Sequence, residues 1–169
     1  MVPRDDDRET LAMKAPHCAT IATPSDREIV ITRTFDAPRR VVFDAWTKPE
    51  HVAQWWDPSR TPLAICEIDL RLDGAFRFVP QGAAGSAHSF TGTYREIAPP
   101  ERLVFTTPSP SGATSVGTLV FKEREGGTSL TMTITCASAA DRDALLKMRV
   151  DVGTVRTLDN LEEYLRRIG

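Results

Sequence analysis

A hydrophobic stripe near the C-terminus constrains the fold more than any other feature of this chain. Eight apolar residues recur there at spacings of three and four, which places them on one helix face and predicts a single helix over residues 138–168. They are Leu145, Met148, Val152, Val155, Leu158, Leu161, Leu165 and Ile168. Ser138 and Asp141 are typical of a helix start, since a hydroxyl can accept an unpaired backbone N–H and a carboxylate favours the positive helix end. A helix this long needs a broad apolar surface to lie on.

The chain before this helix supplies such a surface as a series of strands. Apolar and polar residues alternate in segments bounded by turn residues. These segments predict strands at residues 27–35, 63–72, around 76–78, 88–97, 102–107, 116–124 and 128–136. In the first of them, Ile29, Ile31 and Arg33 share one face.

The hairpin after the second strand has two candidate registers. Asp73 and Gly74 form a strong turn signal. A two-residue loop would pair Arg71 with Phe76 and mix charge with aromatic rings. A three-residue loop would pair Leu72 with Phe76 and keep one apolar face, so we expect the second register.

Two short helices are predicted between the first and second strands. Pro38 suits the first turn of a helix, and residues 47–50 repeat a helix-start pattern as Thr-x-x-Glu. These helices carry Trp46, Trp55 and Trp56. Successive strands with helices at the ends indicate an α+β fold, in which a curved antiparallel sheet grips the long C-terminal helix. We expect one domain over residues 27–169 and a flexible tail over residues 1–26, where no apolar period is sustained.

Composition and charge narrow the function classes. The net charge of -2 argues against a nucleic-acid-binding surface. No apolar run approaches the roughly 20 residues of a membrane span, and the N-terminus lacks the apolar core of a signal peptide. Cys18, Cys66 and Cys136 are odd in number and far apart, which fits reduced thiols better than disulfides or a zinc site. We therefore expect a cytoplasmic protein that uses no metal and no cofactor.

Several sequence blocks together resemble one known family. They are ITRTFDAP at residues 31–38, VVFDAWT at 41–47, the tryptophan pair at 55–56, EIDLR at 67–71, FTGTYREI at 90–97, PERLVF at 100–105 and LDNL at 158–161. From about residue 27 to residue 168, the chain resembles the START-like, helix-grip (SRPBCC) superfamily, and within it the branch named after the activator of the heat-shock protein 90 ATPase. The resemblance implies a curved sheet around the long helix, two small helices that close one end, and a cavity between sheet and helix.

The resemblance does not by itself select a function. Members of the superfamily carry ligand-binding, cyclase-like and co-chaperone roles, and the family motif fixes no catalytic residue. This chain departs from bacterial relatives in the long helix, where Arg149 and Val150 replace a Gly-Met pair and Thr154 often replaces a larger residue. Arg149 is expected at the rim or in the lining of the cavity, so it bears on which ligand the cavity accepts.

Residues that could act as acids or bases are few. The sequence contains none of the common hydrolase, metalloprotease or phosphate-binding motifs. His17 lies in the predicted tail and His51 early in the second short helix, while His88 opens a strand and is the candidate base, although a structural role is the simpler interpretation. Carboxylates on strands are further candidates if they face the cavity, with cross-strand ion pairs as the simpler interpretation. These are Glu67, Asp69 and Glu96.

The expected cavity lining combines aromatic residues with residues of the long helix. The candidate ligand-binding residues are Trp56, Phe76, Phe78, Phe90, Tyr94, Met148, Arg149, Val152 and Val155. Tyr94 and Arg149 would supply the polar contacts. We also expect Gly153, in mid-helix, to let the sheet or a ligand approach closely.

These residues predict a protein that binds a small, largely apolar molecule. One alternative is a cyclase-, hydrolase- or lyase-like enzyme, which would need a buried carboxylate or His88 pointing into the cavity. Another is a co-chaperone-like interaction domain, which would need an exposed apolar patch. A homodimer formed through a sheet edge or the tryptophan helices is a further hypothesis.

Overall fold

One curved sheet of eight antiparallel strands carries four helices. The computed structural model describes residues 19–82 and 89–168. The strands are β1 (Thr20–Ala22), β2 (Glu28–Phe35), β3 (Leu63–Ile68), β4 (Ala75–Pro80), β5 (Phe90–Ala98), β6 (Arg102–Pro108), β7 (Thr114–Arg124) and β8 (Gly127–Thr135). The helices are α2 (Arg39–Thr47), α3 (Pro49–Trp55), α4 (Ala139–Lys147) and α5 (Val150–Ile168). The strand order is β1-β2-β8-β7-β6-β5-β4-β3, which confirms the predicted α+β helix-grip fold.

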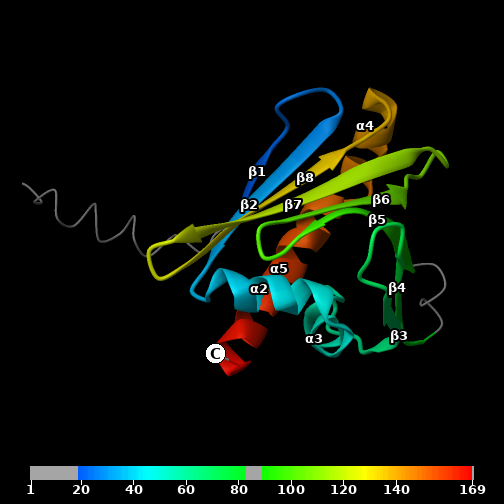
Figure 1. Cartoon of the computed structure of the whole chain (residues 1–169). Coiled ribbons are helices and arrows are strands. Elements are labelled where there is room, and N and C mark those ends of the chain that lie inside the picture. The colour runs from blue at the N-terminus through cyan, green and yellow to red at the C-terminus, as the bar shows by residue number, and fades with distance from the viewer. Residues whose placement is uncertain (1–18, 83–88, 169) are drawn as a thin grey trace, which may run out of the picture.

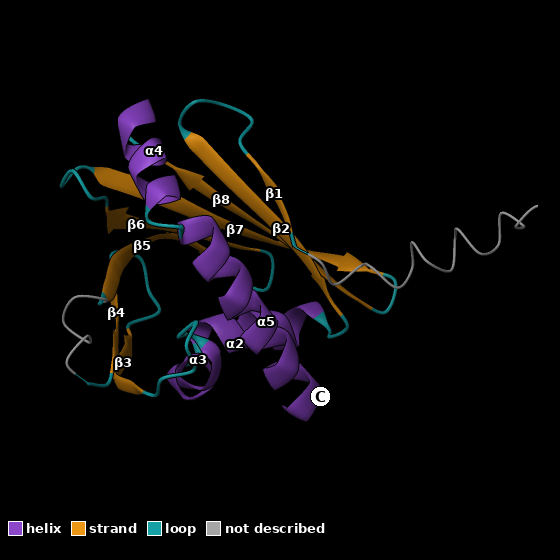
Figure 2. Cartoon of the chain, turned by 180° about the vertical axis from the view of Figure 1, so that it is seen from behind, coloured by secondary structure: helices purple, strands orange, loops and turns teal. Residues whose placement is uncertain are grey.

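All four helices lie on the same side of the sheet. Helix α5 crosses the concave face obliquely, with α2 and α3 beside its C-terminal half and α4 at its other end (Figures 1 and 2). The sheet curves so strongly that β3 and β4 stand almost upright at one end, while β2, β8 and β7 run obliquely (Figure 1). Register shifts in β3 and β5, at residues 63–65 and 94–96, accompany this curvature, because a bulge bends its strand.

The core forms where the concave face meets the helices. Along β2, the inward-facing Ile29, Ile31, Arg33 and Phe35 are buried and alternate with half-buried residues, as the sequence pattern predicted. Helices α2 and α3 add Trp46 and Trp55, whose rings meet edge to face at 4.7 Å between centroids. The Trp55 indole N–H donates to the Ala45 carbonyl, which satisfies its buried polar group.

The predicted single C-terminal helix is interrupted. Helix α4 ends at Lys147, Arg149 has a left-handed backbone (φ 57°), and α5 begins at Val150. The predicted start is confirmed, since Ser138 accepts a hydrogen bond from the Asp141 N–H. Because the helix changes direction at the break, the stripe does not stay on one buried face.

The two ends of the predicted stripe therefore differ in burial. Leu158, Leu161 and Leu165 are buried, whereas Met148 is 65% exposed and Val152 is also exposed.

The hairpin between β3 and β4 differs from both predicted registers. β3 ends at Ile68, which pairs with Phe76, and residues 69–74 form the loop. The Asp69 N–H donates to the Ala75 carbonyl and the Arg71 N–H donates to the Asp69 carbonyl, so the chain turns earlier than we predicted. Leu72 lies in this loop and is exposed.

Three smaller differences concern element ends. The short strand β1, within the segment for which we predicted a tail, pairs with β2, and residues 1–18 of that segment lie outside the described residues. Lys48 occupies the N-cap position of α3 without a side-chain cap, and the Thr47 hydroxyl donates back to the Phe43 carbonyl. None of the described helices is both long and apolar enough to cross a membrane.

Candidate functional site

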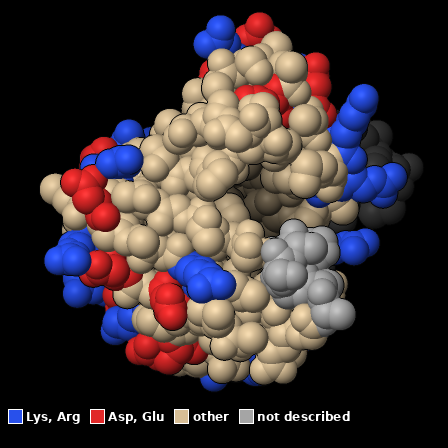
Figure 3. Space-filling view, turned by 90° about the vertical axis from the view of Figure 1, so that its right-hand side faces the viewer, with Lys and Arg blue, Asp and Glu red and all other residues tan. Residues whose placement is uncertain are grey.

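An apolar hollow opens on the concave side of the sheet between α2, α3 and strands β4 to β7. The volume between its side chains is about 300 Å³ when the part open to solvent is included, of which about 20 Å³ is free for a water-sized molecule. Its lining is Trp46, Trp56, Phe76, Phe78, Phe90, Tyr94, Leu103, Phe105 and Leu119. Figure 3 shows a hollow on the side of the molecule that carries β3 and β4, walled mainly by uncharged residues. We call this region, β4 to β6 with Trp46 and Trp56, the hollow half.

Two phenylalanine–glycine pairs shape the wall of the hollow. Phe76 pairs with Gly92 on the neighbouring strand, and Phe105 pairs with Gly117. A Cβ atom on Gly92 would lie 2.3 Å from Phe76 Cζ, and one on Gly117 would lie 2.4 Å from Phe105 Cε2. Each ring therefore lies across the glycine of the next strand, which only a residue without a side chain permits.

The aromatic rings contact one another around Phe76. Its centroid lies 5.2 to 5.5 Å from those of Phe78, Phe90, Tyr94 and Phe105. Trp56 adds a second contact set, 4.8 Å from Phe78 and 5.1 Å from Phe90. Such ring pairs contribute about 1 kcal/mol each beyond the burial of their area, so the wall is a stable cluster.

Two polar groups of this wall have no hydrogen-bond partner in the described part of the chain. They are the indole N–H of Trp46, which is 8% exposed, and the hydroxyl of Tyr94, which is 3% exposed. Burial raises the pKa of Tyr94, and the nearby Cys66 raises it further. The pKa of Cys66 is also raised by burial, to about 11, and its thiol contacts the Pro49 carbonyl. The Tyr94 hydroxyl and the Cys66 thiol are therefore protonated at neutral pH.

The structure separates the predicted ligand-binding residues into two groups. Trp56, Phe76, Phe78, Phe90 and Tyr94 line the hollow together. The predicted residues of the C-terminal helix do not belong to this lining.

Of these helix residues, Val155 is half-buried, whereas Met148, Arg149 and Val152 are exposed. The predicted close approach of the sheet to Gly153 is wrong, since a Cβ there would meet only Pro58 Cγ, at 4.0 Å, and the approach of a ligand stays a prediction.

Four lining residues were missing from our predicted set. Trp46 was assigned to the helix plug, and Leu103, Phe105 and Leu119 were treated only as strand residues. Strand pairing is the signal that finds one of them, because Phe105 lies opposite Tyr94, which belonged to the predicted set.

The candidate acids and bases lie elsewhere. Asp69 and Glu96 are about half exposed and pair with Arg71 and Arg102, and Glu67 is exposed on β3 opposite Arg77. His51 binds the Tyr164 hydroxyl, which joins α3 to α5. His17 and His88 lie outside the described residues. Within residues 19–82 and 89–168, no group of three or more His, Cys, Asp or Glu is placed to hold a metal ion.

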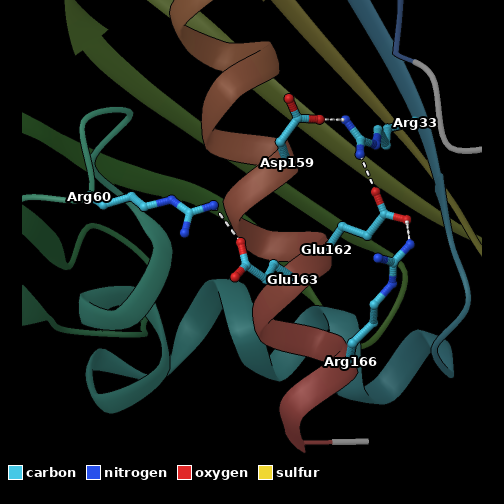
Figure 4. Close-up of polar contacts among 6 residues, drawn as sticks. All are labelled: Arg33, Arg60, Asp159, Glu162, Glu163 and Arg166. Carbon is cyan, nitrogen blue, oxygen red and sulfur yellow. Dashed lines mark hydrogen bonds and ion pairs between the residues drawn. The ribbon is translucent and has the colours of Figure 1, made fainter.

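A charged network fastens α5 to the other half of the concave face. Arg33 on β2 is 4% exposed and donates to Asp159 and Glu162 on α5, and Glu162 also accepts from Arg166 at 2.9 Å (Figure 4). The Arg33 guanidinium lies 5.8 Å from the Phe35 ring centroid, and its Nε is buried without an acceptor among the described residues. We call β2, β8 and the C-terminal half of α5 the docked half.

A second depression lies on the loop after α3 but has a different character. It contains about 470 Å³, including open space, and is lined by residues from Ala53 to Pro62. Its charged groups already have partners: Asp57 accepts from two backbone N–H groups, and Arg60 donates to Asn160. Arg60 also donates to Glu163 (Figure 4). This pairing explains how the loop is held against α5 without a ligand.

Comparison with known proteins gives one family match and a set of structural relatives. The family model described as Activator of Hsp90 ATPase homolog 1-like protein matches residues 36–166. A crystal structure from Rhodobacter sphaeroides is 24% identical with a TM-score of 0.79, and covers 89% of this chain and 99% of that chain. One from Mycobacterium smegmatis is 22% identical with a TM-score of 0.77, and covers 89% and 99% of the two chains. At these identities the likeness shows the shared fold. The search of curated proteins finds no match.

Proposed function

Because the chain belongs to the family of Activator of Hsp90 ATPase homolog 1-like proteins, and because its sheet carries an apolar hollow, we propose that it binds a small, largely apolar molecule there. The hollow carries the proposal: nine uncharged side chains converge on one concave space, and small-molecule sites are concave and mostly apolar with few polar groups. Burial of ligand surface against the rings would supply the binding free energy, at about 25 cal/mol per Å² of apolar area.

The distribution of charge supports binding over catalysis. No carboxylate or imidazole belongs to the described lining, whereas the cyclase-, hydrolase- or lyase-like alternative needs an acid or base there. The paired carboxylates Asp69 and Glu96 are about half exposed and bonded to arginines. The described groups in the hollow thus favour retention of a molecule without conversion.

Calorimetric titration of the purified full-length chain with 1-indanone tests this proposal. The compound is a small bicyclic ketone, largely apolar and uncharged. We expect saturable binding at one site per chain, weakened at least tenfold in Phe90→Ala, which removes a ring from the lining. Met148→Ala is the matched control, because Met148 is apolar but exposed and lies outside the lining.

The proposal is wrong if the wild-type chain shows no saturable binding of any neutral bicyclic compound up to its solubility. It is also wrong if Met148→Ala weakens binding as much as Phe90→Ala does, since the compound would then occupy an external surface.

A further inference from the structure

The carbonyl groups at the end of α3 are bonded by side chains of α5. The last carbonyls of a helix have no partner within it, so they need water or a side chain as donor. The Asn160 amide donates to the Asp57 carbonyl at 2.9 Å and to the Trp55 carbonyl at 3.5 Å. The Thr157 hydroxyl donates to the carbonyl of Trp56, which lies between them in the sequence, at 3.2 Å. Thr157 and Asn160, which we call the capping pair, therefore bond three successive carbonyls.

The orientation of the Asn160 side chain is fixed at both of its polar atoms. Its Oδ1 accepts a hydrogen bond from Arg60 Nε at 3.1 Å, while its Nδ2 donates to the carbonyls. Arg60 also binds Glu163, one turn further along α5 (Figure 4). Both members of the capping pair are more than nine-tenths buried, so water has little access to the groups that they bond.

Trp56 connects this cap to the hollow. It occupies the C-cap position of α3 and, of the three residues whose carbonyls are bonded, it alone lines the hollow. Its ring centroid lies 4.8 Å from that of Phe78 and 5.1 Å from that of Phe90. A tryptophan side chain rotates about only two bonds and occupies few rotamers, so the backbone that carries it decides where the ring lies. The capping pair itself does not belong to the lining, so its influence on the hollow passes through Trp56.

We infer that Thr157 and Asn160 are positioning residues for the binding site: by capping α3 they fix the backbone of Trp56, and so the place of its ring in the lining. The inference rests on the proposed binding function and adds a control of the site by the long helix, which contributes no residue to the lining. Asn160 differs in this role from its neighbour Asp159, which binds Arg33 on β2.

Two substitutions remove the cap with little change of shape. Asn160→Asp keeps an oxygen that can accept from Arg60 but replaces the amide donor by a second acceptor, so the bonds to the two carbonyls are lost. Thr157→Val replaces only the hydroxyl by a methyl group. Thr154→Val is the matched control, because it makes the same change one turn earlier on α5, at a hydroxyl without a hydrogen bond to α3 or its loop among the described residues.

Fluorine NMR of the full-length chain, labelled with fluorinated tryptophan, follows the Trp56 ring without any ligand. The chain has three tryptophans, and replacement of each by phenylalanine in turn assigns the signals. We expect the Trp56 signal to shift in Asn160→Asp and, by a smaller amount, in Thr157→Val, and to stay in place in Thr154→Val. Leu165→Ala, which opens a cavity at a buried position elsewhere on α5, controls for a general loss of stability and should leave the signal in place.

Calorimetric titration with 1-indanone measures the consequence for binding. We expect Asn160→Asp to bind the compound about fivefold more weakly than the wild type, which is the equivalent of one lost ring contact. Thr157→Val should show a smaller loss, and Thr154→Val should bind like the wild type.

The outcomes separate this inference from the binding function. If the Trp56 signal stays in place in both capping variants, or shifts as far in Leu165→Ala, the inference is wrong. It is also wrong if the wild type binds 1-indanone and Asn160→Asp binds it equally well. Should Asn160→Asp fail to fold, Thr157→Val decides by the same two measurements. If the wild type binds no neutral bicyclic compound, the binding function is wrong, while the fluorine signals still decide whether the capping pair places the Trp56 ring.

Discussion

The two halves of the concave face are packed through different kinds of side chain. In the docked half, a buried arginine crosses from β2 to carboxylates on α5. In the hollow half, aromatic rings from β4 to β6 pack on one another and on Trp56, around space that the chain does not fill. Arg33 in the first half is paired with two carboxylates, although its Nε has no acceptor among the described residues. In the second half, the buried indole N–H of Trp46 makes no hydrogen bond within the described part of the chain.

This difference distinguishes residues that stabilise the fold from residues that are available to bind a ligand. A buried charge that is paired within the chain needs no further partner, and removal of one member of the pair destabilises the fold. A buried donor without an acceptor costs about 1–3 kcal/mol of stability, and a ligand that supplies the acceptor can compensate for that cost. Stability and binding should therefore respond to substitutions in different halves.

The largest effect should come from Arg33→Met in the docked half. The substitution leaves Asp159 and Glu162 without their shared cation. Breaking a buried pair costs about 3–5 kcal/mol, and because Asp159 is 58% exposed we expect the lower end, about 3 kcal/mol of unfolding free energy in urea. The affinity for 1-indanone should stay unchanged. Arg156→Met, at an exposed position on α5, is the control and should change stability by less than about 0.5 kcal/mol. A loss below about 1 kcal/mol for Arg33→Met would contradict the docking role.

A smaller loss should follow from Gly92→Ala in the hollow half. The new Cβ would lie 2.3 Å from Phe76 Cζ and 2.6 Å from the Thr106 carbonyl oxygen, so the ring has to leave its place. Overpacking of this kind costs about 1–3 kcal/mol. Urea unfolding measures this cost, and titration with 1-indanone should show weaker binding because the displaced ring enters the hollow. Unchanged affinity together with reduced stability would show that the Phe76 wall is structural only.

Alkaline pH should weaken the packing of β3 against α3, where the Cys66 thiol donates to the Pro49 carbonyl. Burial raises the pKa of the Cys66 thiol from its ordinary value of 9.0 to about 11. The folded state then holds its proton more tightly than the unfolded state does, so the stabilisation is complete below pH 9 and is lost as the pH rises towards 11. Urea unfolding at pH 8.5 and 10.5 should show a smaller decline for Cys66→Ala than for the wild type. Equal declines would mean that the thiol does not contribute.

The smallest effect should be a gain, from Gly153→Ala near the start of α5. A Cβ there meets only Pro58, at 4.0 Å, so the position has room for alanine. Alanine is favoured over glycine within helices by about 1 kcal/mol, and we expect a rise of about 0.5–1 kcal/mol in urea unfolding. Because it adds the same methyl group as Gly92→Ala at an open position, this variant is the control for that one. A loss of stability would show that Gly153 has a close neighbour after all.

The docked half could largely be predicted from the sequence. The alternation in residues 28–35 places Ile29, Ile31 and Arg33 on one face, and that face is buried. An arginine in such a series requires a buried acid partner, so an ion pair was implicit in the pattern. Which carboxylates supply it depends on how α5 crosses the sheet, and no local pattern in the sequence specifies that crossing.

The break before α5 could not be predicted, because the usual signals are missing. Neither glycine nor proline occupies position 149, and the apolar spacing continues from Leu145 through Met148 to Val152. Arg149 takes a left-handed conformation that non-glycine residues rarely adopt, so tertiary packing overrides the local preference. The exposed Met148 and Arg149 lie at this break, and neither belongs to the lining.

The lining of the hollow half could be predicted from the sequence only in part. Alternation places Phe76 and Phe78 on one side of β4, with Cys66 and Ile68 paired opposite them. The pairing of Phe105 with Tyr94 depends on register, and register depends on loops whose length the turn residues did not reveal. Leu72 continues the alternating pattern past Ile68 into the loop, so the pattern does not show where β3 ends.

Methyl NMR of the leucine side chains, during titration with 1-indanone, tests the contrast between the two halves most directly. Leu103 and Leu119 line the hollow, whereas Leu158 and Leu161 are buried on α5 in the docked half. The account predicts saturable shifts of the Leu103 and Leu119 methyl signals, with those of Leu158 and Leu161 unchanged. Saturable shifts confined to Leu158 and Leu161, or none at any of the four, would contradict it.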